Sequence, residues 1–150
     1  MAEATGTEPV VREVLIAASP ETVFPFFTEP DKMTRWLCSE ATVDPRPGGI
    51  CHQTHPGSET HTDGPYYMRG EYVEVTPPTR VVFTWGFTNE SLNQPPGKST
   101  VEVTLEPENG GTRLRLVHTG LPETAAEDAG TGWKQLLEQL AVVVAAGDTG

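Results

Sequence analysis

Near its end the chain reads Gly130-Thr-Gly-Trp133-Lys-Gln-Leu136-Leu137-Glu-Gln-Leu140-Ala-Val-Val143-Val144. The apolar residues recur at the three- and four-residue spacing of an α-helix, and polar residues occupy the opposite side. This is the only long, strongly amphipathic segment of the sequence, and nearly everything before it has the pattern of β-strands. A helix this one-sided must bury its apolar stripe, so the segment predicts a helix that covers one face of a β-sheet.

Gly132 lies on the buried side of this predicted helix, one turn before Leu136. A glycine within a helix costs about 1 kcal/mol relative to alanine. It is tolerated most easily where the backbone approaches a neighbour closely or where a space stays open. Close helix–sheet packing and room for a bound molecule are therefore alternative interpretations of Gly132.

Length and charge limit the classes of function. With 150 residues and a net charge of −11, we expect one domain over residues 9–147, between flexible tails at residues 1–8 and 148–150. The acidic charge argues against nucleic-acid and membrane partners, because both require a basic surface. The first residues do not resemble a signal peptide and no apolar run could span a membrane, so a cytoplasmic protein with Cys38 and Cys51 as reduced thiols is expected.

Turn signals divide the rest of the chain into strands and two short helices. Ser19-Pro20-Glu21 predicts a helix start, Pro25 should kink or end that helix, and a second short helix is expected near Pro30-Asp31. The predicted strands cover residues 10–18, 38–44, 50–55, 66–75, 81–87, 100–105 and 112–119.

Strict alternation assigns the side chains of the later strands to two faces. It places Val73 with Val81 and Phe83 on the apolar face, Tyr72 on the opposite face, and His118 with Leu114 and Leu116 on the covered face. The order of elements predicts an α+β fold in which a curved antiparallel sheet of six to seven strands wraps around one long helix. Such a sheet usually leaves a cavity beneath the helix.

The chain resembles the helix-grip superfamily, also called START-like or SRPBCC and typified by Bet v-like folds. Within it, the chain is most similar to the branch named for the activator of heat-shock protein 90 ATPase. The resemblance rests on five motifs in order: Ala18-Ser-Pro-Glu-Thr-Val-Phe24; Pro30-Asp-Lys-Met-Thr-Arg-Trp36; Arg46-Pro-Gly-Gly49; Gly70 to Pro78 with Val82-Phe-Thr-Trp85; and Leu116-Val-His-Thr-Gly120 with Gly132-Trp133. They cover about residues 10 to 145.

Two features of the sequence depart from this family pattern. Pro25 is unusual inside the first helix, and family members usually carry large apolar residues where this chain has Cys51, Gln53 and His55. The family pattern turns these three residues inward, although periodicity alone leaves the inward face open. The resemblance therefore implies a pocket that is more polar than is usual for the family.

His118 and His55 are the candidate catalytic residues. If both reach the cavity, one neutral and one charged imidazole would form an acid–base pair. The alternatives are that His118 is a hydrogen-bonded core histidine and that His55 lies in solvent at a strand end. The predicted ligand-binding residues are Trp36, Cys51, Gln53, His55, Phe83, Trp85, Phe87, Leu116, His118, Gly132, Trp133, Leu136 and Leu137, although the tryptophans also suit a core.

Histidines and acids also crowd one short region, which contains His52, His55, Glu59, His61 and Asp63. Imidazole and carboxylate groups suit zinc or iron, but the spacing matches no compact ligand pattern. Because His52 and His55 have opposite parity on a strand, they point to opposite faces. We therefore expect no metal site and no cofactor.

These observations favour a protein that binds a hydrophobic or amphipathic small molecule, lipid-like or polyketide-like, in the cavity. The first alternative is a cyclase, aromatase or hydrolase that uses His118 and His55. A co-chaperone module, implied by the name of the family branch, ranks third. Self-association into a homodimer through a strand edge or the small helices is compatible with all three.

Overall fold

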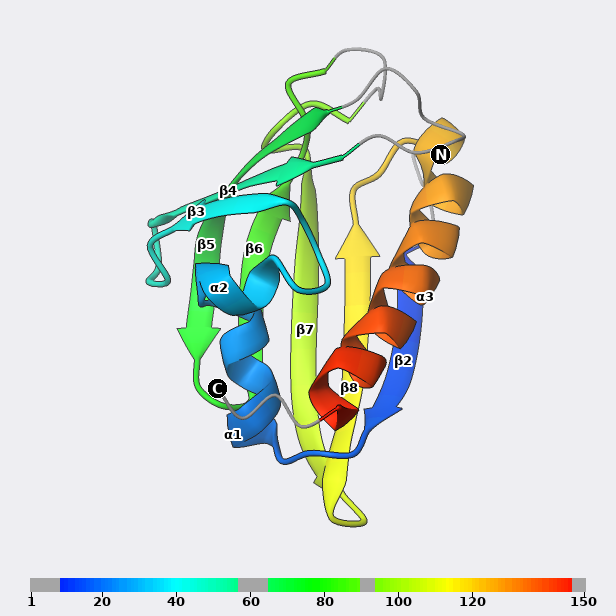
Figure 1. The fold of residues 1–150 in the computed structure, drawn as a ribbon. Helices are drawn as coiled ribbons and strands as arrows, with labels where there is room; N and C mark the ends of the chain where they lie inside the picture. Colours follow the sequence, from blue (N-terminus) through cyan, green and yellow to red (C-terminus); the bar gives the residue numbers. More distant parts are fainter. Residues whose placement is uncertain (1–8, 57–64, 90–93, 147–150) are drawn as a thin grey trace.

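A computed structural model describes residues 9–56, 65–89 and 94–146 (Figure 1). Within them the elements are, in chain order, β2 (Val10–Ile16), α1 (Pro20–Val23), the 3₁₀ turn η1 (Phe24–Phe27), α2 (Pro30–Met33), β3 (Glu40–Val43), β4 (Ile50–His55), β5 (Tyr66–Thr76), β6 (Arg80–Trp85), β7 (Ser99–Glu108), β8 (Gly111–Thr119) and α3 (Glu123–Ala145).

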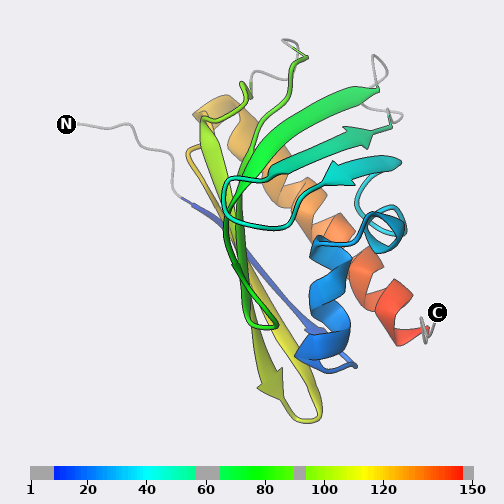
Figure 2. The same cartoon turned by 90° about the vertical axis from the view of Figure 1, so that its left-hand side faces the viewer.

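The described strands form one antiparallel sheet of seven strands in the order β2-β8-β7-β6-β5-β4-β3. The first strand therefore pairs with the last, with Val14 opposite Leu114. All the other neighbours in this order follow one another directly along the chain. The sheet is strongly curved, and α1, α2 and α3 all lie on its concave side (Figure 2). The predicted α+β helix-grip architecture is confirmed.

Helix α3 covers the half of the sheet that contains β2 and β8. The buried side chains on its apolar side are those of Trp133, Leu137, Leu140 and Val144. The polar side of the helix, predicted from the sequence, is exposed. The helix begins at Glu123, earlier than the amphipathic stretch indicates, because its first turns are rich in alanine. None of the helices in the described ranges is long and apolar enough to cross a membrane.

The short helices begin and end where the sequence predicts. The Ser19 hydroxyl accepts a hydrogen bond from the Thr22 amide at 3.3 Å and caps α1, and the chain tightens into a 3₁₀ turn at Pro25. Two hydrogen bonds fix this turn to its surroundings. Trp36 Nε1 donates to the Phe26 carbonyl at 3.0 Å, and the Tyr72 hydroxyl donates to the Phe27 carbonyl at 2.9 Å.

The predicted faces of β5 are wrong at two residues. Tyr72 is buried opposite Phe83, whereas Val73 is 53% exposed. The pairing of β5 with β6 shifts between Tyr72 and Glu74, so Val73 is an extra residue in a β-bulge. A bulge reverses the alternation on one side of itself, and strict parity cannot predict that reversal.

Candidate functional site

Five aromatic rings meet between the sheet and α3, and we call this group the aromatic cluster. The Trp85 indole at the end of β6 is central to it. Its ring centroid lies 5.1 Å from Trp133 on α3, 5.5 Å from Phe87, 5.6 Å from His55 on β4 and 5.8 Å from His118 on β8. Most of these pairs are edge-to-face, which is the favoured geometry for aromatic rings. The structure thus brings together residues that lie far apart in the sequence.

His118 belongs to a chain of hydrogen bonds whose direction is fixed. Trp133 Nε1 can only donate, and it lies 3.0 Å from His118 Nδ1, so this nitrogen carries no hydrogen. The hydrogen of the neutral ring is therefore on Nε2, which donates to Ser99 Oγ at 2.9 Å. The Ser99 hydroxyl donates in turn to the Trp85 carbonyl at 3.2 Å. Both ring nitrogens of His118 are satisfied within the protein.

A second polar chain runs along the inward face of β4. Cys51 and Gln53 are buried, as the family pattern predicts. His55 Nε2 lies 2.8 Å from Gln53 Oε1, and Gln53 Nε2 donates to Cys51 Sγ at 3.5 Å. His55 is the last residue of β4 and is half-buried. Its imidazole packs against Trp85 and Phe87, so the side chain does not lie wholly in solvent.

Burial keeps these polar groups uncharged at neutral pH. Desolvation lowers the pKa of His55 and of His118 to about 4. The acid–base pair considered from the sequence requires one charged imidazole, and neither ring is charged at pH 7. Burial also raises the pKa of Cys51 to about 11 and that of Cys38 to about 12, and both residues are free thiols.

Gly132 faces open space. Gly132 is half-buried, and a Cβ atom built on it would meet no atom within 4 Å beyond its neighbours in the chain and the local helix backbone, so the interpretation as close helix–sheet packing is wrong. The close approach occurs at Gly130, where Arg12 of β2 donates from Nε to the Gly130 carbonyl at 3.1 Å. Successive residues of a helix are separated by about 100°, so Gly132 lies on the flank of α3 that faces away from β2.

The remaining predicted ligand-binding residues are distributed through the core. Trp36 packs on Phe27 beside the small helices, at 5.2 Å between ring centroids, and has no described ring contact with the aromatic cluster. Phe83 joins Trp85 to Tyr72. Leu116 and Leu137 are buried, and Leu136 is half-buried on the same flank of α3 as Gly132.

Sequence reasoning did not identify Ser99 or Tyr72 as part of the site. Ser99 could have been found, because it continues the inward alternation of Val101 and Val103. Tyr72 could not, because the bulge places it inward.

The described residues contain no group of three or more potential metal ligands. Of the histidine- and acid-rich region, Glu59, His61 and Asp63 lie outside the described residues.

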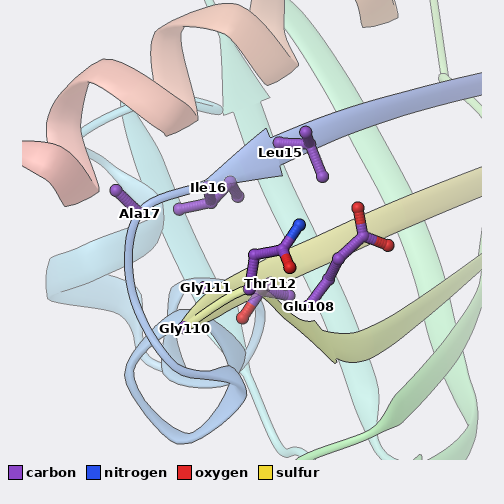
Figure 3. Close-up of a pocket in the computed structure, with 8 residues that line it drawn as sticks. Leu15, Ile16, Ala17, Glu108, Gly110, Gly111 and Thr112 are labelled. Carbon is purple, nitrogen blue, oxygen red and sulfur yellow. The ribbon is translucent and has the colours of Figure 1, made fainter.

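A surface pocket of about 320 Å³ lies elsewhere, at the turn between β7 and β8 (Figure 3). Thr112, which lines it, is six residues before His118 on β8, a separation of about 20 Å along a strand. The residues that line this pocket come from the end of β2 and from the β7–β8 hairpin: Leu15, Ile16, Ala17, Glu108, Asn109, Gly110, Gly111 and Thr112. This pocket is distinct from the aromatic cluster.

Solved structures share this fold over nearly the whole chain. The protein CV1439 from Chromobacterium violaceum is 28% identical and has a TM-score of 0.78, covering 91% of this chain and 96% of that one. DynU16, a protein of the dynemicin biosynthetic locus, has a TM-score of 0.76 at 22% identity and covers 95% of this chain and 49% of that one. The Aha1 dimer from Colwellia psychrerythraea has a TM-score of 0.68 at 17% identity and covers 90% of this chain and 94% of that one.

Sequence comparison identifies the family. The human activator of 90 kDa heat shock protein ATPase homolog 1 is 26% identical over 118 residues, which are 78% of this chain but only 31% of that protein. The family model described as activator of Hsp90 ATPase homolog 1-like protein matches residues 17–145. The helix-grip fold, the order of the motifs and this match agree, and the chain belongs to the activator of Hsp90 ATPase homolog 1-like family.

Proposed function

We propose that the chain binds a mostly apolar small molecule between the Gly132 flank of α3 and the inner wall formed by β4 and β6. The observation that carries this proposal is the open space at Gly132, on a helix whose other flank is packed against β2. A helix-interior glycine with no close neighbour costs stability, and a ligand that needs the space explains why the cost is tolerated.

The wall opposite this flank suits such a ligand. The rings of Trp85 and Phe87 provide apolar surface, and Gln53 and His55 provide a few uncharged polar groups. Small-molecule sites generally combine these two features. The fold shared with a protein of a biosynthetic locus agrees with a ligand of this kind.

Filling the space tests the proposal. Gly132→Phe should abolish the rise in melting temperature that a ligand from a panel of lipids and aromatic compounds produces in the wild type. Gln135→Phe is the matched control, because Gln135 is exposed on the same helix and the same side chain there should leave ligand binding unchanged. A panel in which no compound stabilises the wild type, or in which both variants behave alike, would count against the proposal.

The same arrangement gives less support to an acid–base enzyme. Both nitrogens of His118 are used within the protein, and burial lowers the pKa values of His118 and His55. A co-chaperone role is suggested by the name of a relative, and this chain matches only 31% of the length of that relative. A pull-down with the cognate chaperone would test this role. Pairing of two copies is proposed by analogy with the dimeric Aha1 neighbour, and its test is the subunit count.

A further inference from the structure

One hydrogen bond joins the two halves of the fifth sequence motif. Trp133 Nε1, which bears the only polar hydrogen of the indole, lies 3.0 Å from His118 Nδ1. Trp133 is only 3% exposed, so without this acceptor its N–H group would be buried and unpaired, which costs free energy. The bond therefore decides how the indole lies: the edge that bears the nitrogen faces β8.

The His118 imidazole is itself fixed by its surroundings. Its Nε2 donates to Ser99 Oγ at 2.9 Å, and Ser99 donates to the Trp85 carbonyl. The Trp85 indole packs against the other two rings, with its centroid 5.8 Å from that of His118 and 5.1 Å from that of Trp133. A flip of the imidazole would place ring carbons where both hydrogen bonds are made. His118 therefore presents its acceptor to Trp133 in one orientation.

These bonds leave no polar hydrogen for a ligand on the side of the site formed by α3 and β8. The N–H groups of Trp133 and His118 and the hydroxyl hydrogen of Ser99 are all donated within the protein. What the protein offers on this side is the carbon surface of the indole. The uncharged polar groups of Gln53 and His55 lie on β4 instead.

The buried core also offers no charge to an ionised ligand. Among the described residues, the buried polar side chains are those of Gln53, Ser99, Thr112 and His118. None of them is charged at pH 7, because burial lowers the pKa of His118 to about 4. An ionised ligand would lose its hydration without gaining a counter-charge, so a neutral ligand is favoured.

We infer that His118 is a positioning residue for the ligand site: it holds the N–H of Trp133 against the sheet, so that a ligand meets only the carbon surface of the indole. The inference rests on the proposed function and narrows its ligand class. The part of the ligand that lies against α3 is a neutral aromatic or aliphatic ring system without a hydrogen-bonding group. Any polar group of the ligand lies on the β4 side.

Two substitutions of nearly the same shape test this role by NMR. His118→Leu replaces Nδ1 by a methyl group, so the Trp133 N–H loses its acceptor. His118→Asn places an amide oxygen, which can accept, at the same number of bonds from Cβ as Nδ1. The Trp133 N–H signal should move to lower frequency and exchange faster in His118→Leu, and it should stay near its wild-type position in His118→Asn. The N–H signal of Trp36, which donates to the Phe26 carbonyl, is the internal control and should not move.

Ligand preference gives a second measurement, which a merely structural role would not change. Naphthalene and quinoline have the same shape, but quinoline has a ring nitrogen that accepts a hydrogen bond. At pH 7, calorimetry should show that the affinity for quinoline relative to naphthalene rises about fivefold in His118→Leu, because the freed indole N–H donates to that nitrogen. The ratio should keep its wild-type value in His118→Asn. A loss of fold stability alone would weaken the binding of both compounds equally.

The outcomes separate the inference from the proposed function. An unchanged affinity ratio, or an unmoved Trp133 signal, in His118→Leu overturns the inference and leaves the proposed function intact. Failure of the wild type to bind either compound overturns the ligand class, and failure of the whole panel of lipids and aromatic compounds overturns the proposed function as well. If His118→Leu does not fold, the wild type decides: a scalar coupling between Trp133 Nε1 and His118 Nδ1 across the hydrogen bond is expected, and its absence contradicts the inference.

Discussion

Ser99 connects β7 to β8 and to α3 through hydrogen bonds of fixed direction. It accepts from His118, donates to the Trp85 carbonyl and so orients the imidazole that accepts from Trp133. A chain of buried hydrogen bonds contributes most to the stability of the fold when every polar group in it has a partner, because burying an unpaired polar group costs free energy. The Ser99 hydroxyl therefore supports the position of the Trp133 indole above the sheet, together with the packing of that indole on Trp85.

We predict that Ser99→Ala lowers the free energy of unfolding by about 1 to 3 kcal/mol, because it leaves His118 Nε2 and the Trp85 carbonyl without their partner. Urea titration measures this loss. Thr100→Ala is the control, since Thr100 lies half-buried on the other face and should change stability by less than about 0.5 kcal/mol. Equal effects at the two positions would refute the network.

Stability should also depend on pH through the buried imidazoles. Burial lowers the pKa of folded His118 and His55 to about 4, against about 6.5 in an unfolded chain. Between these values the unfolded chain binds more protons, so this stability is fully present above pH 6.5 and is lost as the pH falls toward 4. His118→Gln should lose less stability than the wild type between pH 7 and pH 5 in urea titrations, and parallel losses would contradict this assignment.

At the level of single residues, alternation alone placed His118 inward, and the family pattern placed Cys51 and Gln53 inward. What alternation cannot provide is the hydrogen-bond partner, because Ser99 meets His118 only through the register of β7 against β8. The sequence therefore identified both histidines as candidates but could not show that both ring nitrogens of His118 are hydrogen-bonded within the protein.

At the level of elements, α3 presents two different flanks. One flank approaches β2 through Gly130 and Arg12, and the other presents Gly132 to open space. The sequence predicts this helix well from Trp133 onward, where the apolar stripe is strong. It does not predict the start at Glu123, because the alanine-rich first turns carry little amphipathic signal. The bulge at Val73 was missed for a similar reason, since one extra residue leaves no mark on composition.

Gly132 of α3 and Gly70 of β5 should respond oppositely to substitution by alanine. Gly132→Ala should leave stability unchanged or raise it by up to about 1 kcal/mol, because the new methyl group meets nothing and alanine favours a helix. Gly70→Ala should lower stability by more than about 2 kcal/mol, because its Cβ would collide with the Thr84 carbonyl in the neighbouring strand. Thermal unfolding of both variants tests this contrast, and a destabilised Gly132→Ala would show that the space is not open.

At the level of the whole molecule, the curved sheet and α3 meet at the aromatic cluster, where Trp85 of β6 lies 5.1 Å from Trp133 of α3. The order of strands and helices could be predicted because each element follows from its local sequence pattern. The family resemblance then indicated how the sheet curves around the long helix. The identity of a ligand could not be predicted, because it depends on which polar atoms remain unpaired after folding.

Native mass spectrometry of freshly purified protein, followed by organic extraction, tests the central claim most directly. The account predicts a small neutral compound that stays with the folded wild type, disappears on denaturation, and is absent from Gly132→Phe but present in Gln135→Phe. The same spectra give the subunit count. A wild type that carries no compound and binds none of the lipids and aromatic compounds of the panel, or a compound that remains equally bound to Gly132→Phe, would contradict the account.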